Sequence, residues 1–231
     1  MKITLSILLL FSISFAGKAQ TFAPNGRMDM NTNPGAVITT KKPTSHTVLS
    51  SSYYLKEQWM HGLIKLKKEN SAIRGKFRYN LITHYIEVIQ EEELNYISRH
   101  DIAGLEWQKT DGNSIHFVNA MGYRKIQPVR GMLEVLIDGK TMLFRHSYLA
   151  LKEPDYIAAL QVGSQHSQIT LASALYFGKQ GQLVKVPFRK KKILEYFAPY
   201  QNQLKKFIKQ HHLKIRKAED LSKLVHYYNS L

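Results

Sequence analysis

Ten histidines and no cysteine make imidazole the most conspicuous metal-binding group in this chain of 231 residues. His211 and His212 are adjacent, so on a helix their side chains would point about 100° apart and would not chelate one ion. His84, His116 and His146 fall in expected strands, where only the fold could bring them together. We therefore predict no metal and no cofactor from the sequence.

Three other arrangements have part of a catalytic pattern. The tripeptide Gly-Lys-Thr at 139–141 ends like a phosphate-binding loop, but Glu134 stands where that loop needs its first glycine. The tripeptide Arg-His-Asp at 99–101 sets a base beside a carboxylate, although neighbouring strand residues point to opposite faces. Glu87 with Glu134 or Asp138 would supply the two carboxylates of a glycosidase. Because none of these patterns is complete, we predict no catalytic residue.

The candidate binding element of the sequence is a run of four cations: Arg189, Lys190, Lys191 and Lys192. Between 185 and 231 the chain has twelve Lys and Arg residues and three acids, which is a net +9 of the formal +16. Such an excess favours anionic partners. Because an apolar run of helical spacing follows directly, we interpret the four cations as a solvated helix entrance with weak electrostatic affinity.

Period-two alternation of apolar and polar residues dominates 53–187. The segment AIRGKFRY at 72–79 puts its large apolar residues on one face and three cations on the other. Asp-Gly at 111–112, Asp-Gly at 138–139 and Gly-Lys-Gln-Gly at 178–181 lie between such segments and predict three hairpins. Short strands joined by local turns indicate an antiparallel β-meander, either a curved sheet or barrel-like.

From 188 to 231 the apolar period changes to 3.6, which is typical of amphipathic helices. Two apolar stripes result, one with Tyr200, Leu204, Phe207, Ile208 and His211, the other with Ala218, Leu221, Leu224, Val225 and Tyr228. Such stripes must pack on another element, and the sheet is the element available. The predicted fold class is therefore α+β, with the antiparallel meander first and two to three amphipathic helices last.

The first nineteen residues have the three parts of a secretory signal peptide. Lys2 supplies a positive charge, 5–15 an apolar core, and small residues a cleavage site between Ala19 and Gln20. The apolar core is shorter than the about 20 residues that span a bilayer. We expect a chain exported to the periplasm or the medium, with no transmembrane segment after cleavage and no disulfides to stabilise it.

Pro, Asn, Thr and Ser predominate from 20 to 52, which predicts a flexible tether with strand character at 36–39 alone. The predicted organisation is therefore a signal peptide at 1–19, this tether, an antiparallel β domain at 53–187 and a basic helical region at 188–231. The helical region is expected to pack on the sheet.

Several segments resemble a group of uncharacterised exported proteins common in Bacteroidota. The resemblance rests on the signal peptide ending in Ala19-Gln20, GKFRYNLITHYIEVI at 75–89, LEVLIDGKTMLFRH at 133–146, LKEPDY at 151–156 and LKIRKAEDLSKLVHYYNSL at 213–231. It implies export and this layout, and it carries no assigned activity.

These observations favour a non-enzymatic exported module that acts by binding or assembly, with anionic envelope components or another envelope protein as its partner. No nucleic-acid-binding module is recognisable, so no nucleic-acid partner is expected. Two alternatives stay open. The fold could assemble an Asp/Glu/His site for an enzyme acting on glycan or peptide, or an apolar interior for a small-ligand carrier.

The exported chain is predicted to begin at Gln20, with or without cyclisation of that residue. Intact-mass measurement of material from the periplasm or the medium tests this, because cleavage removes a defined mass. Export of a chain that keeps Met1 to Ala19 would contradict the signal-peptide interpretation.

Overall fold

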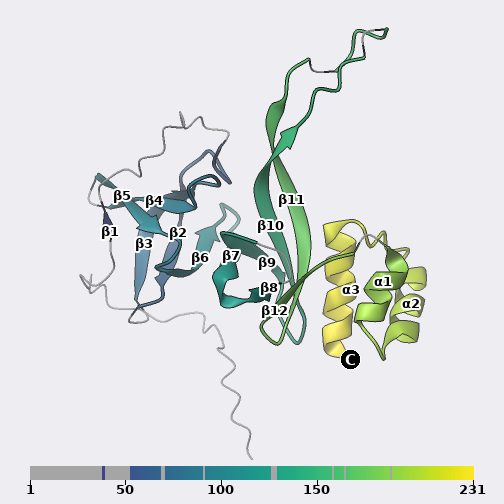
Figure 1. The fold of residues 1–231 in the computed structure, drawn as a ribbon. Helices are drawn as coiled ribbons and strands as arrows, with labels where there is room; N and C mark the ends of the chain where they lie inside the picture. The colour runs from purple at the N-terminus through teal and green to yellow at the C-terminus, as the bar shows by residue number, and fades with distance from the viewer. Residues whose placement is uncertain are drawn as a thin grey trace, which may run out of the picture. The chain divides into compact units, whose positions relative to one another are not determined.

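A single sheet of twelve strands and three C-terminal helices form the fold of this computed structural model (Figure 1). The signal peptide, its cleavage point between Ala19 and Gln20, and nearly all of the predicted tether lie outside the described residues. The residues that the structure describes are 38–39, 53–68, 71–90, 92–125, 129–157, 159–163, 165–187 and 189–231.

Most strands pair with a strand close to them in the chain. The strands are β1 (Ile38–Thr39), β2 (Met60–Leu66), β3 (Ala72–Tyr79), β4 (Tyr85–Gln90), β5 (Glu93–Ser98), β6 (Ile102–Gln108), β7 (Ser114–Asn119), β8 (Arg124–Lys125), β9 (Met132–Ile137), β10 (Met142–Lys152), β11 (Gln168–Lys179) and β12 (Gln182–Lys185). Their order in the sheet is β1-β5-β4-β3-β2-β6-β7-β9-β10-β11-β12-β8, in which β1 pairs with β5 and β8 with β12. Only β12 and β8 are parallel in the described sheet, so the predicted antiparallel architecture is confirmed.

The three predicted hairpins are present as β6–β7, β9–β10 and β11–β12. The last is the tightest, because Lys179 pairs with Gln182 and two residues make the turn. Gln180 and Gly181 have φ of 50° and 72°, which is the left-handed backbone that a two-residue hairpin turn needs. Ile38 and Thr39, inside the predicted tether, form β1 and pair with β5.

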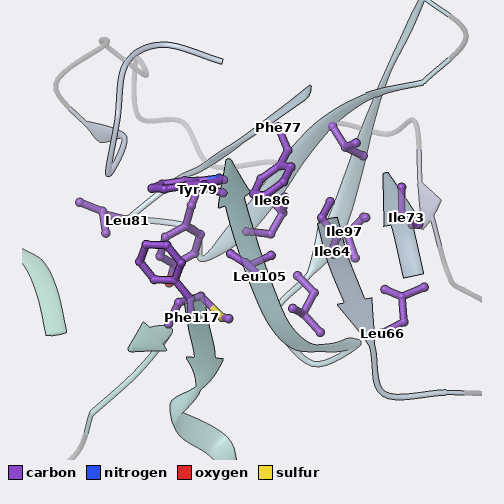
Figure 2. Close-up of a cluster of buried hydrophobic side chains, with 14 residues drawn as sticks. Ile64, Leu66, Ile73, Phe77, Tyr79, Leu81, Ile86, Ile97, Leu105 and Phe117 are labelled. Atoms are coloured by element: carbon purple, nitrogen blue, oxygen red, sulfur yellow. The ribbon is translucent and has the colours of Figure 1, made fainter. Parts of the chain in front are cut away.

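The first hydrophobic cluster comes from the strands and from Leu81 in the turn after β3, without the helices. Figure 2 shows Phe77, Ile64 and Leu105 among its members, with the strands around them. Its buried residues are Ile64, Leu66, Ile73, Phe77, Tyr79, Leu81, Ile86, Val88, Ile97, Ile102, Leu105, Trp107, Phe117 and Met132. A core that one sheet supplies by itself requires the sheet to curve around it. The described sheet nevertheless stays open, since β1 and β8 stand at opposite ends of the strand order.

The three helices form the second cluster together with β10 and β11. They are α1 (Lys190–Tyr196), α2 (Gln201–Gln210) and α3 (Ala218–Ser230). Leu143 and Phe177 come from the strands, and the helical region supplies Ile193, Phe197, Leu204, Ile208, Ile215, Leu221, Leu224, Val225 and Tyr228. The predicted packing face of α3 is buried as expected. In the part of the chain that the structure describes, no helix has both the length and the apolar character needed to cross a bilayer.

Phe207 packs against the second cluster as predicted, but at its margin, while His211 of the same predicted arc is exposed. The Phe207 ring is half-buried and stacks on Tyr227 with 4.1 Å between ring centroids, while Leu204 and Ile208 are the buried contacts of α2. The predicted apolar arc was too wide, because α2 buries its central positions and leaves the edge of the arc against α3.

A polar contact ties the end of α3 to the β9–β10 turn. The backbone N–H of Thr141 donates to Asn229 Oδ1 at 2.9 Å, and Asn229 Nδ2 donates to the Thr141 carbonyl at 2.9 Å. Gly139 has a φ of 144°, and a Cβ there would lie 2.5 Å from Asn229 Nδ2. The glycine of this turn therefore makes room for the helix as well as for the turn backbone.

Leu224→Ala should lower the free energy of unfolding by about 2–5 kcal/mol, because it empties a fully buried position between helix and sheet. Phe207→Ala should cost less, because its ring is only half-buried. Urea titrations of the two variants measure the difference. A Leu224→Ala chain as stable as the parent would contradict the docking of α3 on the sheet.

Candidate functional site

Strands β10 and β11 continue well beyond the strands that flank them. β9 pairs with β10 as far as His146, and β12 pairs with β11 from Tyr176 onward. Past these points the two strands pair only with each other among the described residues, out to Lys152 and Gln168. Figure 1 shows the resulting two-stranded extension, residues 147–175, which we call the arm.

The arm concentrates exposed apolar surface. Of the eleven exposed large hydrophobic side chains in the described residues, eight are Tyr148, Leu151, Tyr156, Ile157, Leu160, Val162, Ile169 and Leu171. Leu151 is 64% exposed and Leu171 is 55% exposed. Contiguous exposed apolar surface on a folded protein marks an interaction site.

Four of the arm's apolar side chains share one face. Leu149 pairs with Leu171 and Leu151 with Ile169 across the two strands. Since side chains alternate along a strand, Leu149 and Leu151 point to the same side as Leu143, which packs against the helices. We call Leu149, Leu151, Ile169 and Leu171 the apolar stripe. Leu149 at its inner end packs against the first cluster, and Leu151, Ile169 and Leu171 are exposed to solvent.

A groove of about 640 Å³ lies at the base of the arm. Its walls come from β9, β10, β11, the segment after β12, the start of α3 and the residues just after Tyr54. The lining residues are Leu55, Lys56, Glu134, Arg145, Ser147, Tyr148, Leu171, Ala172, Ser173, Ala174, Leu175, Lys185, Val186, Pro187, Ile193, Ile215, Arg216 and Ala218. The groove thus joins the apolar stripe to the buried helix–sheet core through Ile193 and Ile215.

The charged side chains of the groove are mostly cationic. Lys56, Lys185 and Arg216 are exposed along it, and Arg145 accompanies them. Glu134 is its one carboxylate, and Arg145 Nη1 lies 3.1 Å from Glu134 Oε2 on the neighbouring strand. With that pair neutralised, three cations remain beside an apolar surface. The groove therefore suits a ligand that has both carboxylates and apolar groups.

The four cations predicted as a binding element lie elsewhere. Arg189, Lys190, Lys191 and Lys192 are exposed at the start of α1, and Lys192 Nζ forms an ion pair with Glu195 at 2.9 Å. None of the four lines the groove, although Ile193 beside them does. Sequence reasoning missed the groove because its cations come from four distant segments. One signal in the sequence could have indicated the arm: residues 147–175 are nearly neutral in a strongly basic chain.

The fold brings two of the three strand-region histidines into one positive environment. His84 lies near Arg99, His146 and Arg130, and His146 Nε2 lies 2.8 Å from the Arg130 carbonyl. His116 lies elsewhere, 3.7 Å from a Glu106 oxygen. In the described residues no group of three His, Cys, Asp or Glu side chains could hold a metal ion.

His84 and Tyr79 form a hydrogen bond whose proton can be placed. Burial and the positive charges of Arg99, His146 and Arg130 lower the pKa of His84 to about 4. Burial raises the pKa of Tyr79. At neutral pH the Tyr79 hydroxyl therefore stays protonated. It donates a hydrogen bond to Nδ1 of neutral His84, with 2.7 Å between the two atoms. Neither residue lines the groove.

The candidate carboxylate pair is not assembled. Glu87 is buried, accepts from the Tyr54 hydroxyl at 2.8 Å and pairs with Arg78 Nη2 at 2.7 Å. Its strand β4 is separated from β9, which holds Glu134, by β3, β2, β6 and β7. Asp138 is exposed in the β9–β10 turn. Glu87 thus belongs to a structural ion pair, with the Arg78 guanidinium 4.0 Å above the Tyr54 ring.

Comparison with protein-family models, with curated proteins and with solved structures found no match for this chain.

The chain should lose stability as the pH falls from about 6.5 to about 4, because unfolded His84 takes up a proton there that the folded chain excludes. His146, whose pKa burial also lowers, acts in the same direction. His84→Asn should flatten this dependence, since asparagine tolerates the positive φ of 59° at this position and does not titrate.

Urea unfolding of both proteins at pH 7 and pH 5 measures the effect. Carboxylate titrations are common to the two proteins and cancel in the comparison. If the parent and His84→Asn lost equal stability between pH 7 and pH 5, the pKa of His84 would not be lowered in the folded chain.

Proposed function

We propose that this chain is a non-enzymatic module, exported to the periplasm or the medium, that binds another envelope protein through the groove and the apolar stripe. The observation that carries the proposal is that eight of the eleven exposed large hydrophobic side chains of the described residues lie on the arm. Leu149, Ala174 and Leu175 at the base of the arm pack against the buried clusters, whereas the eight exposed side chains belong to none of them. This exposed surface is suited to a partner.

Charge supports the arm as the contact. The chain has a formal charge of +16, yet residues 147–175 contain one lysine, two acids and one histidine. Net positive charge elsewhere attracts an acidic partner from a distance. The near-neutral arm can then bury its surface without desolvating many charges, which is the costly step of association.

The chemistry of the groove favours binding over catalysis. Its carboxylate, Glu134, is ion-paired with Arg145, and its other ionisable residues beside Tyr148 are Lys56, Lys185 and Arg216. A general acid–base pair of a hydrolase would need free carboxylates or a histidine within reach of the ligand.

Site-specific photo-crosslinking in the full-length exported chain tests the proposal. A photoreactive residue at Leu171 should give an adduct of one defined mass, and the same residue at exposed Lys76 on β3 should not. Replacing Lys56 and Arg216 together by Gln should weaken the Leu171 adduct. Replacing the four cations at 189–192 by Gln is the matched control. This change should not alter the yield of the Leu171 adduct.

Equal adducts from Leu171 and Lys76 would overturn the proposal. So would a Leu171 adduct that does not respond to the loss of Lys56 and Arg216, because the cationic groove would then play no part in binding.

A further inference from the structure

We propose that the groove receives an extended peptide with alternating acidic and apolar residues, which adds as a new strand to the free edge of β11. This inference rests on the proposed function and names the form that the bound partner takes. It is carried by the backbone geometry of β11, by the point at which β12 ends, and by the charges around that point.

The backbone of β11 presents unpaired groups toward the groove. The Val186 N–H donates to the Leu175 carbonyl at 2.8 Å, so Leu175 directs its backbone polar groups away from β10. Since this direction repeats every second residue, the N–H and C=O groups of Ser173, Leu171 and Ile169 point to the same edge. No described strand pairs with β11 along that edge beyond Tyr176.

Strand β12 ends where a guest strand would begin. It pairs with β11 from Gln182 to Lys185, and Val186 adds one further bond. No described backbone group after Val186 forms a hydrogen bond with β11. Helix α1 follows, and the groove is lined both by residues 185–187 before it and by Ser173 and Leu175 of β11.

The surroundings select the side chains of the guest. An added strand places alternate side chains on the two faces of the arm. The helix-covered face offers Leu171 and Ile169. Lys185 pairs with Tyr176 and so lies on the opposite face, and Lys56 and Arg216 also line the groove. Peptides that join exposed sheet edges gain affinity from the main chain and specificity from alternate side chains. Three outward residues on β11 match a guest of about six residues.

The probe is a fluorescein-labelled, N-acetylated and C-amidated Glu-Val-Glu-Val-Glu-Val peptide, with binding followed by fluorescence anisotropy. The matched probes are Lys-Val-Lys-Val-Lys-Val and a Glu-Val peptide N-methylated at alternate residues, made in both registers. We expect binding of the unmodified Glu-Val peptide that weakens with salt. We expect little binding of the Lys-Val peptide, and failure of at least one methylated register.

Ser173→Pro removes an N–H that faces the groove while keeping the β10–β11 bonds, and Ser173→Ala keeps that N–H and is its control. Thermal unfolding of both variants checks that the arm and core are intact. Ser173→Ala should bind the Glu-Val peptide as the parent does. Ser173→Pro should weaken binding several-fold, up to about tenfold, as expected for loss of the one hydrogen bond that the Ser173 N–H would donate.

Each other outcome overturns the inference. Equal binding by Ser173→Pro and by both methylated peptides would mean that the groove holds ligands without strand addition, and the crosslinking result at Leu171 would stand. Absence of binding to the Glu-Val peptide would exclude the acidic guest. Sedimentation of the parent as a dimer that Ser173→Pro dissociates would assign the edge to a second copy of this chain.

Discussion

The antiparallel ladder between β10 and β11 is the contact on which the other parts of the molecule depend. It joins eleven residue pairs from Met142–Gly178 to Lys152–Gln168. At its inner end Leu143 and Phe177 face the helices, while Phe144 and Tyr176 face the opposite cluster with Leu183. The same two strands therefore hold two cores together, and their outer ends are free to form the arm.

The attachment of the helices follows from this ladder. α3 buries Leu221, Leu224 and Val225 against it, and Asn229 caps the turn that leads into β10. One strand thus receives both the apolar packing and the polar contact of the last helix. As a result the groove has a firm wall on the helical side, where Ile193 and Ile215 are buried.

The charged side chains fall into two groups, those paired within the sheet and those exposed on the helical region. Glu87 and Glu134 are engaged by Arg78 and Arg145 within the sheet. Most lysines of the helical region are exposed on the side away from the packing stripe, so they add to the net charge without stabilising the core. The arm stands apart from both groups, being apolar and close to neutral. In the proposed binding, the exposed lysines would attract an acidic partner from a distance, and the near-neutral arm would make the close contact.

Local patterns in the sequence were enough to predict β3, the strands of the three hairpins and the packing face of α3, but not β2 or β8. Each prediction depends on residues a few positions apart: alternation in 72–79, Asp-Gly or Gly-Lys-Gln-Gly turns, and the spacing of Leu221, Leu224 and Val225. The half-buried position of Phe207 could not be predicted from local spacing, because its ring stacks on Tyr227 of α3 and so depends on where that helix packs.

Only the tertiary structure revealed the groove, the arm and the neutral His84. Lys56, Arg145, Lys185 and Arg216 are brought together by strand order and by helix docking, and neither leaves a periodic trace in the chain. The run at 189–192 was conspicuous because its cations are adjacent in the sequence. Adjacent residues need not form a binding surface, and none of these four lines the groove. A binding surface is made by contacts between distant segments, and those are set by how the cores pack.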